Sequence, residues 1–445
     1  MTSKMSIQET EELIIRLIHE RDTAIARVQE LERKLAFYEN PHTPPSRKPL
    51  TAKKPVSDDA GPKKRGAPVG HRGATRDTPV PNETIDVTAS DCPMCHNSPG
   101  DPVDIEEKVI ENIVQPEDVK VQVIRYSLNH YVCKNCGHSF SAKHEDCPQQ
   151  GKFGPRLLVY TTMLKFHMRG PLRKSQEFLH HWSNFDISPK GIMDMHLRVG
   201  DACRQEYDTL VRKIRAALWV HIDETGMPVN GKNWWLWIFR TDQNDVLIVL
   251  RPSRGAKVVE SILGTDWTNP VIVDGWRAYE WINILQRCWA HLLREVDAYK
   301  EISENGKRLS DEVHAMFLEL KDVLLLDPPM NIREEKKRLF ETQMAKLAER
   351  YDKCEELSKP LTYIKRGLGH WYTCLLYPGM EPTNNLGEQA MREHVIIRNI
   401  IGCFRSESGA ENYQYIASLL ASWRLQGKNI FEELERVVRQ NLCLA

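Results

Sequence analysis

Residues 218–290 place the strongest limit on the fold, because short apolar segments follow one another there in a fixed order. Three strand-like segments come first, and a polar turn at residues 242–244 separates the second from the third, as in an antiparallel meander. A helix and two more strand-like segments follow. The expected elements are strands at Leu218–Asp223, Trp234–Arg240 and Val246–Leu250, a helix at Ala256–Leu263, and strands at Pro270–Asp274 and Leu285–Ala290.

Two of these strands are expected to end in an aspartate, Asp223 and Asp274. The run before Asp274 is almost continuously apolar, as in a strand that is buried on both faces of a sheet. Three antiparallel strands, a helix and two further strands is the element order of a ribonuclease-H-like core. In that core the first strand lies centrally and the fourth lies beside it, so the two carboxylates are expected to lie close together.

A third acidic residue, Glu388, lies in a downstream segment that is expected to be helical. Close carboxylates repel each other unless a cation lies between them, and magnesium is a cation that prefers oxygen ligands. Two Mg²⁺ (or Mn²⁺) ions per active site are the apparatus that cleaves and joins phosphodiester bonds. We therefore predict that Asp223, Asp274 and Glu388 are catalytic and bind these metal ions.

Each acid also has an ordinary structural explanation. An aspartate at the end of a strand often caps a turn, and Glu388 has Arg392 four residues later, the spacing of a helical ion pair. The order of elements around the three acids favours them as a group. Other carboxylates compete for the same role, namely Glu224, Glu280, Glu295 and Asp297.

The two close cysteine pairs are Cys92-x-x-Cys95 and Cys133-x-x-Cys136. Each pair can direct two thiolates at one ion, and four sulfurs complete a tetrahedral structural zinc site. The segment between the pairs alternates like strands, so residues 91–150 are predicted to form a zinc-ribbon-like DNA-binding domain. An iron–sulfur site and a redox pair remain alternatives.

Residues 1–40 are predicted to form an oligomerisation helix. Apolar residues recur at heptad spacing with charges on the other faces, the pattern of a short coiled coil. A homo-oligomer is therefore expected, and packing of this helix on its own chain is the alternative. The heptad positions are Ile14, Leu17, Ala24, Val28, Leu31, Leu35 and Tyr38.

Residues 41–90 are rich in proline and in basic residues and should not fold alone. Such an arm could lie along a DNA backbone, where neutralising phosphates releases counterions. A solvated linker is the alternative. The DNA-contacting candidates in this arm are Lys63, Lys64, Arg65, His71 and Arg72.

Residues 151–212 are expected to be helical. Segments 172–182 and 188–199 flank a turn, and Ser188-Pro189 is a good helix start. One interpretation is a helix-turn-helix with Lys190 and Arg198 on DNA; ordinary helical packing is the other.

The rest of the chain completes a multidomain α+β protein. We assign residues 213–303 to the first part of the core, 304–375 to a charged helical insertion, and 376–445 to the completion of the core. Cys288 and His291, three apart at a strand-to-helix transition, have the spacing of metal ligands. Without a second such pair, a supporting structural role near the active site is favoured.

The net charge gives no indication of a nucleic-acid partner, because 61 basic residues balance 61 acidic ones. No apolar run approaches the length of a membrane span, and the N-terminus is charged and amphipathic rather than signal-like. We expect a cytoplasmic, nucleoid-associated protein with no membrane partner.

At these motifs the chain resembles the transposases of the insertion-sequence-66 family, of the Asp-Asp-Glu superfamily. The resemblance covers almost the whole length, from the N-terminal helix to Arg398-Asn399. Its clearest segments are Pro68–Gly73, the paired cysteines, His221–Thr225, Val273–Gly275, Cys288–Leu292 and Asn384–Arg392. By this resemblance Asp223, Asp274 and Glu388 match the catalytic triad.

The same resemblance implies supporting roles for Asn385 and Arg392, and accessory proteins of the same element as partners. This chain has Thr383 where the family often has Asp, a difference outside the three acids.

The leading hypothesis is a DNA transposase that binds double-stranded DNA at terminal inverted repeats, cleaves there and joins the ends to target DNA. One alternative is a non-catalytic DNA-binding relic or repressor. The other is a ribonuclease-H-like nuclease or resolvase.

Overall fold

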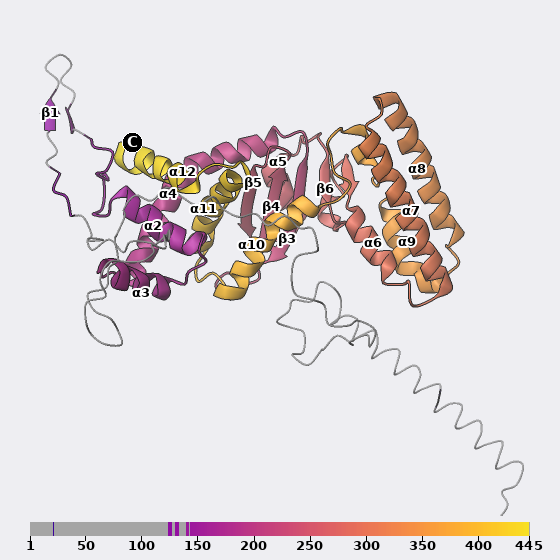
Figure 1. Cartoon of the computed structure of the whole chain (residues 1–445), viewed down its shortest axis with the longest axis horizontal. Coiled ribbons are helices and arrows are strands. Elements are labelled where there is room, and N and C mark those ends of the chain that lie inside the picture. Colours follow the sequence, from indigo (N-terminus) through magenta and orange to yellow (C-terminus); the bar gives the residue numbers. More distant parts are fainter. Residues whose placement is uncertain (1–20, 22–122, 127–129, 133–138, 142, 445) are drawn as a thin grey trace, which may run out of the picture. The chain divides into compact units, whose positions relative to one another are not determined.

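The computed structural model describes residues 21, 123–126, 130–132, 139–141 and 143–444 of the chain (Figure 1). The chain divides into two compact units, Met1–Ile113 and Val114–Ala445. The predicted coiled coil lies outside the described residues apart from Arg21. Two predicted sites also lie outside them, namely the basic arm with Lys63, Lys64, Arg65, His71 and Arg72, and the zinc ligands Cys92, Cys95, Cys133 and Cys136.

A five-stranded mixed sheet organises the second unit (Figure 1). Its strand order is β5-β4-β3-β6-β7, so the first strand in sequence is central and the fourth lies beside it, as predicted. β3, β4 and β5 are antiparallel neighbours, whereas β6 runs parallel to β3 and β7 runs parallel to β6. The strands are β3 (Val220–Gly226), β4 (Trp235–Thr241), β5 (Val246–Arg251), β6 (Val271–Val273) and β7 (Leu285–Arg287).

Two predicted strand ends are wrong by three residues, and the other predicted strand bounds agree with the structure to within two residues. β3 continues to Gly226 because its antiparallel partner β4 pairs with it as far as that residue, so Asp223 lies inside the strand. The predicted strand at Leu285–Ala290 stops at Arg287, because Cys288 is already the N-cap of helix α6 (Trp289–Asp297). The predicted helix at 256–263 is confirmed as α5 (Ala256–Leu263).

Helices from both ends of the second unit pack with the sheet into one core. Leu158, Val199 and Leu434 are fully buried in the same cluster as the strands, so residues from the region 151–212 and from the C-terminus share that core. These helices are α2 (Pro155–Phe166), α3 (Leu172–Ser183), α4 (Pro189–Arg215), α10 (Asn385–Ile401), α11 (Glu407–Leu425) and α12 (Ile430–Val438), followed by a last turn, η5 (Arg439–Leu444).

The predicted helix pair of the helix-turn-helix is present as α3 and α4, but α4 is much longer than expected. It begins at the predicted N-cap Ser188, whose hydroxyl accepts from Gly191 N. It then continues to Arg215, and Tyr207 on this extension donates a 3.0 Å hydrogen bond to the Ile248 carbonyl of β5. The second half of α4 is therefore a core helix.

Helix α11 covers the edge strand β5. Ser422 Oγ accepts from Val246 N at 2.8 Å, Ser418 Oγ accepts from Ile248 N at 2.8 Å, and Gln414 Oε1 accepts from Leu250 N at 3.1 Å. These acceptors recur every four residues on the helix, while the donors recur every second residue on the strand. Side chains of α11 thus satisfy backbone groups that a further strand would otherwise pair.

The region 304–375 is helical, as expected, and forms a second core with α6 (Figure 1). Trp289, Trp371 and Tyr372 are fully buried at its centre, with Trp289 and Trp371 ring centroids 5.9 Å apart. Its elements are α7 (Glu304–Leu326), α8 (Met330–Arg350), α9 (Ser358–Arg366) and the short turns η3 (Glu355–Leu357) and η4 (Thr373–Leu376).

Two short antiparallel strands, β1 (His130–Val132) and β2 (Ser139–Ser141), flank residues 133–138.

Among the described residues, no helix is long and apolar enough to cross a membrane.

Candidate active site

Asp223 in β3 and Asp274 directly after β6 lie on neighbouring strands in the interior of the sheet. The parallel strands β3 and β6 pair Val220 with Val271 and His221 with Ile272. Continuing this register by two residues brings Asp223 opposite Asp274, the residue that follows β6. The carboxyl ends of neighbouring parallel strands are where α/β sheets place ligands.

The turn after β6 fixes Asp274. Its Oδ1 accepts hydrogen bonds from Gly275 N at 2.5 Å and Trp276 N at 2.9 Å. Tyr363, from α9 in the insertion, donates to the Asp274 carbonyl at 2.6 Å. Gly275 has φ of 140°, a conformation that side chains rarely adopt. The turn, with its glycine, therefore orients this carboxylate.

The electrostatics of Asp223 indicate a crowded acidic site. Burial, together with repulsion from Glu224, Asp274 and Glu388, raises the pKa of Asp223 to about 8, and burial is the largest of these causes. The hydrogen bond that its Oδ1 accepts from Glu224 N, at 3.0 Å, acts in the opposite direction. Three neighbouring carboxylates thus disfavour the ionised form of Asp223, because like charges that lie close together repel each other.

Glu224 is the most deeply buried of the competing carboxylates. Its Oε1 accepts from Arg254 Nη2 at 2.7 Å, and its Oε2 accepts from the hydroxyl of Tyr279. Burial and the charge of Asp274 raise its pKa to about 6, against the effect of those two hydrogen bonds. Because its oxygens are already bonded, Glu224 acts as a structural link between β3 and the segment after β6.

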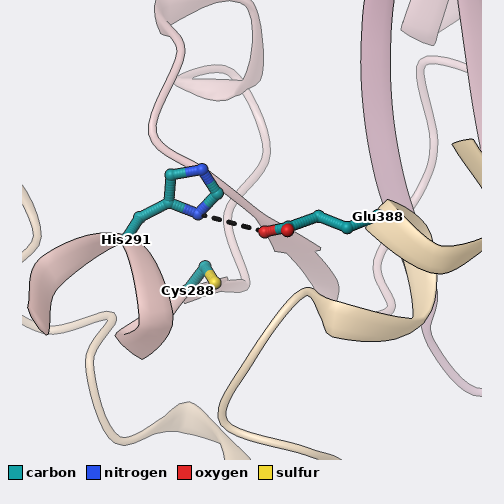
Figure 2. Close-up of side chains that lie close together, drawn as sticks. All are labelled: Cys288, His291 and Glu388. Atoms are coloured by element: carbon teal, nitrogen blue, oxygen red, sulfur yellow. Dashed lines mark ion pairs between the residues drawn. The ribbon is translucent and has the colours of Figure 1, made fainter. Parts of the chain in front are cut away.

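Glu388 lies in the first turn of α10 and points toward α6 (Figure 2). Its Oε1 is 3.1 Å from Arg294 Nη2 and 3.7 Å from His291 Nδ1. Cys288 completes a cluster with His291 and Glu388, in which one ligand atom of each residue lies within 4.8 Å of the others. Within the described part of the chain this is the group with metal-site spacing; Asp223, Asp274 and Glu388 are not this close together.

The partners that the structure gives Glu388 differ from the helical ion pair considered for it. Arg392 is exposed on α10, and the ion pairs of Glu388 are made with α6 instead. Asn385, the other expected supporting residue of this segment, is also exposed.

Asn384 is a site residue that the sequence reasoning missed. This side chain is 1% exposed. Its Nδ2 donates to the Ile222 carbonyl at 2.8 Å, and its Oδ1 lies 3.1 Å from His221 Nδ1. Since an amide oxygen only accepts, His221 donates from Nδ1. Asn384 N in turn donates to Cys288 Sγ at 3.1 Å. Asn384 thus joins β3, the start of α6 and the start of α10.

Two arginines also hold α10 on the sheet. Arg240 of β4 donates to the Leu386 carbonyl at 3.0 Å. Arg398 donates to Thr225 Oγ1 at 2.8 Å and to the Gly226 carbonyl at 2.6 Å, at the end of β3. The helix that carries Glu388 is therefore fixed to the strand that carries Asp223.

The two DNA-contact candidates that the structure describes lie on the first half of α4. Lys190 is ion-paired with Asp194 on the same helix. Arg198 donates to the carbonyl of Gln150. Neither arrangement tests a role in DNA binding, which stays a prediction for both residues.

Taken together, these features define an α+β protein in which Asp223 inside β3, Asp274 at the end of β6 and Glu388 on α10 form a candidate acidic site. The family model described as "Transposase IS66 family" matches residues 150–412. The chain therefore belongs to the IS66 transposase family, and the predicted resemblance is confirmed. No curated protein matches the sequence at a significant level.

Proposed function

We propose that this chain is a DNA transposase that cleaves DNA at the ends of its element and joins them to target DNA, by a two-metal Asp-Asp-Glu mechanism on a ribonuclease-H-like core. The observation that carries the proposal is the pairing of β3 with β6, whose register brings Asp223 opposite Asp274. Asn384 ties the helix of Glu388 to the same strand. Membership of the IS66 family supports the same reaction class.

The donor set fits hard divalent cations. Three carboxylates provide oxygen ligands of the kind that Mg²⁺ and Mn²⁺ prefer. The raised pKa of Asp223 has the repulsion of Asp274 and Glu388 among its causes, and bound cations would remove that repulsion. Magnesium ions held there supply activation of the attacking water or 3′-hydroxyl and stabilise the charge on the leaving oxygen.

The residues of the chain have distinct parts in this proposal. Asp223 and Asp274 hold the site from the sheet, and the turn at Gly275 keeps Asp274 oriented. Glu388, which contacts Arg294 and His291 of α6 in this structure, would provide the third carboxylate. Asn384 is a positioning residue, because it fixes the start of α10 without carrying a ligand charge.

DNA binding is assigned to segments upstream of the core. We infer that the basic arm, the zinc-bound cysteine pairs and the predicted N-terminal coiled coil bind the terminal repeats as an oligomer. Lys190 and Arg198 on α4 are the candidates for DNA contact that lie closest in sequence to the core.

The test is strand transfer by the purified full-length protein with Mg²⁺ and DNA carrying the element ends. Asp223→Asn, Asp274→Asn and Glu388→Gln should each abolish the joined product, because each removes a metal ligand. Glu280→Gln is the matched control, since Glu280 is an exposed carboxylate six residues after Asp274. The control should retain activity. Glu224 does not serve as the control, because its hydrogen bonds to Arg254 and Tyr279 are structural.

Full strand transfer by any of the three acid variants would overturn the proposed mechanism. Two other results would favour the alternatives. Specific binding to end DNA with no metal-dependent nicking would favour a non-catalytic binding protein. Nicking of structured nucleic acid without joining would favour a nuclease or resolvase.

A further inference from the structure

The cluster of Cys288, His291 and Glu388 has a different ligand chemistry from the acidic site (Figure 2). A thiolate, an imidazole and a carboxylate form a mixed sulfur, nitrogen and oxygen set. Such a set favours zinc or a similar transition metal over magnesium. Three protein ligands also leave the fourth tetrahedral position open.

The spacing is close to what a zinc ion needs. Ligand nitrogen and oxygen atoms lie about 2.0–2.2 Å from zinc, so two of them on one ion lie less than about 4.4 Å apart. His291 Nδ1 and Glu388 Oε1 are 3.7 Å apart. The three ligand atoms lie within 4.8 Å of one another, so only a small closing movement is needed.

The backbone around the cluster is held from both sides. Trp289 N, in the first turn of α6, donates to the Pro382 carbonyl at 3.1 Å. Asn384 N donates to Cys288 Sγ at 3.1 Å. These two bonds cross between the start of α6 and the segment before α10. They fix the thiol relative to the helix of Glu388, and an N–H donor to a ligand sulfur is the kind of contact that orients metal ligands.

We propose that Cys288, His291 and Glu388 bind a zinc-like transition-metal ion, which withdraws Glu388 from the catalytic magnesium ions and holds the enzyme inactive. The metal-binding part stands on the cluster alone, whereas the inhibitory part rests on the proposed function of Glu388. The guanidinium of Arg294 already bonds Glu388 Oε1 from α6. The metal ion would therefore replace this positive charge or bind next to it.

The first measurement counts zinc on the full-length protein after equilibration with zinc chloride and dialysis. Wild type should retain about one more zinc ion per chain than Cys288→Ser or His291→Gln. Serine keeps an acceptor for Asn384 N and is favoured at a helix N-cap, so Cys288→Ser should fold. The predicted zinc site at the paired cysteines is unchanged in every variant, so it cancels in the comparison.

Cys354→Ser is the matched control, because Cys354 is a partly buried thiol outside the cluster. It should retain as much zinc as wild type. Equal zinc content in wild type, Cys288→Ser and His291→Gln would overturn the site.

The second measurement is strand transfer in Mg²⁺ with increasing zinc, normalised to the zinc-free rate of each protein. Zinc should inhibit wild type and Cys354→Ser at concentrations at least about tenfold lower than Cys288→Ser, in line with the effects of weakened metal coordination. If wild type binds one more zinc ion than the variants but zinc does not inhibit its strand transfer, the proposed withdrawal of Glu388 from the magnesium ions is wrong. If wild type binds the additional zinc ion but shows no strand transfer even without zinc, the result counts against the proposed function and still supports the zinc site.

Discussion

At the scale of single residues, the site depends on an amide as much as on the acids. Asn384 uses both ends of its side chain, one for the Ile222 carbonyl and one for His221. His221 is neutral, because burial lowers its pKa to about 4. A buried amide with both ends bonded holds one orientation, so Asn384 sets where α10 begins and where Glu388 can reach.

Asn384→Ala should reduce strand transfer by roughly 10–100-fold, since small displacements of catalytic groups have effects of that size. It should also lower the free energy of unfolding by roughly 1–3 kcal/mol, because His221 and the Ile222 carbonyl lose a buried partner. A positioning role further predicts a higher Mg²⁺ concentration for half-maximal activity.

Gln389→Ala is the control for that experiment, because Gln389 is exposed on the same helix, five residues after Asn384. It should behave like wild type in activity and in stability. If both variants lost activity equally, or if Asn384→Ala changed stability without changing the Mg²⁺ dependence, the positioning role would be wrong.

The acidic site should make stability depend on pH. Asp223 has a pKa of about 8 when folded, against an ordinary value of 3.8. Between these values the folded protein keeps a proton that the unfolded chain has lost, so the free energy of unfolding falls as pH rises from 3.8 to about 8. Asp223→Asn removes this penalty. In metal-free buffer the variant should melt above wild type, with a larger gap at pH 8 than at pH 6.

Each kcal/mol of relieved destabilisation corresponds to roughly 1 °C for a chain of 445 residues that unfolds as a whole. Saturating Mg²⁺ should narrow the gap by stabilising the wild-type carboxylate. Differential scanning calorimetry at the two pH values measures both effects. A gap that is equal at pH 6 and pH 8 would contradict a raised pKa for Asp223.

At the scale of elements, α11 replaces a missing strand. Gln414, Ser418 and Ser422 lie on one face of the helix at intervals of four residues and bond the edge of β5. Ser418 and Ser422 are buried. If one hydroxyl is removed, the backbone N–H of β5 that it bonds cannot bond to water instead.

Ser418→Ala should lower the free energy of unfolding by about 1–3 kcal/mol, because the Ile248 N–H loses its buried acceptor. Ser408→Ala, an exposed serine at the start of the same helix, should change it by less than about 0.5 kcal/mol. Urea unfolding of the two variants makes the comparison. Equal stability would mean that the edge of β5 is satisfied in another way.

At the scale of the whole molecule, local sequence patterns predict part of the fold. The order of apolar segments was enough to predict the central position of β3 beside β6, because each strand has its own run of apolar residues ending near an aspartate. The end of β3 was not predictable in the same way, since its pairing to Gly226 depends on β4. The length of α4 depends likewise on contacts with β5.

Contacts between distant segments explain what the sequence did not reveal. The spacing of Cys288 and His291 was visible, but their approach to Glu388 depends on α6 and α10 meeting. The role of Asn384 depends on bonds across more than 90 residues, to Cys288 and to β3. Its neighbour Asn385 has the same side chain, and burial alone separates the two.

The central claim is that Asp223, Asp274 and Glu388 share one pair of metal ions during the reaction. The most direct measurement is anomalous scattering from Mn²⁺ in crystals of the full-length protein bound to DNA with the element ends. The account predicts two manganese peaks roughly 3.5–4 Å apart, in contact with all three carboxylates and with Glu388 released from Arg294. Manganese bound elsewhere, or Glu388 still paired with Arg294 and His291 in that complex, would contradict it.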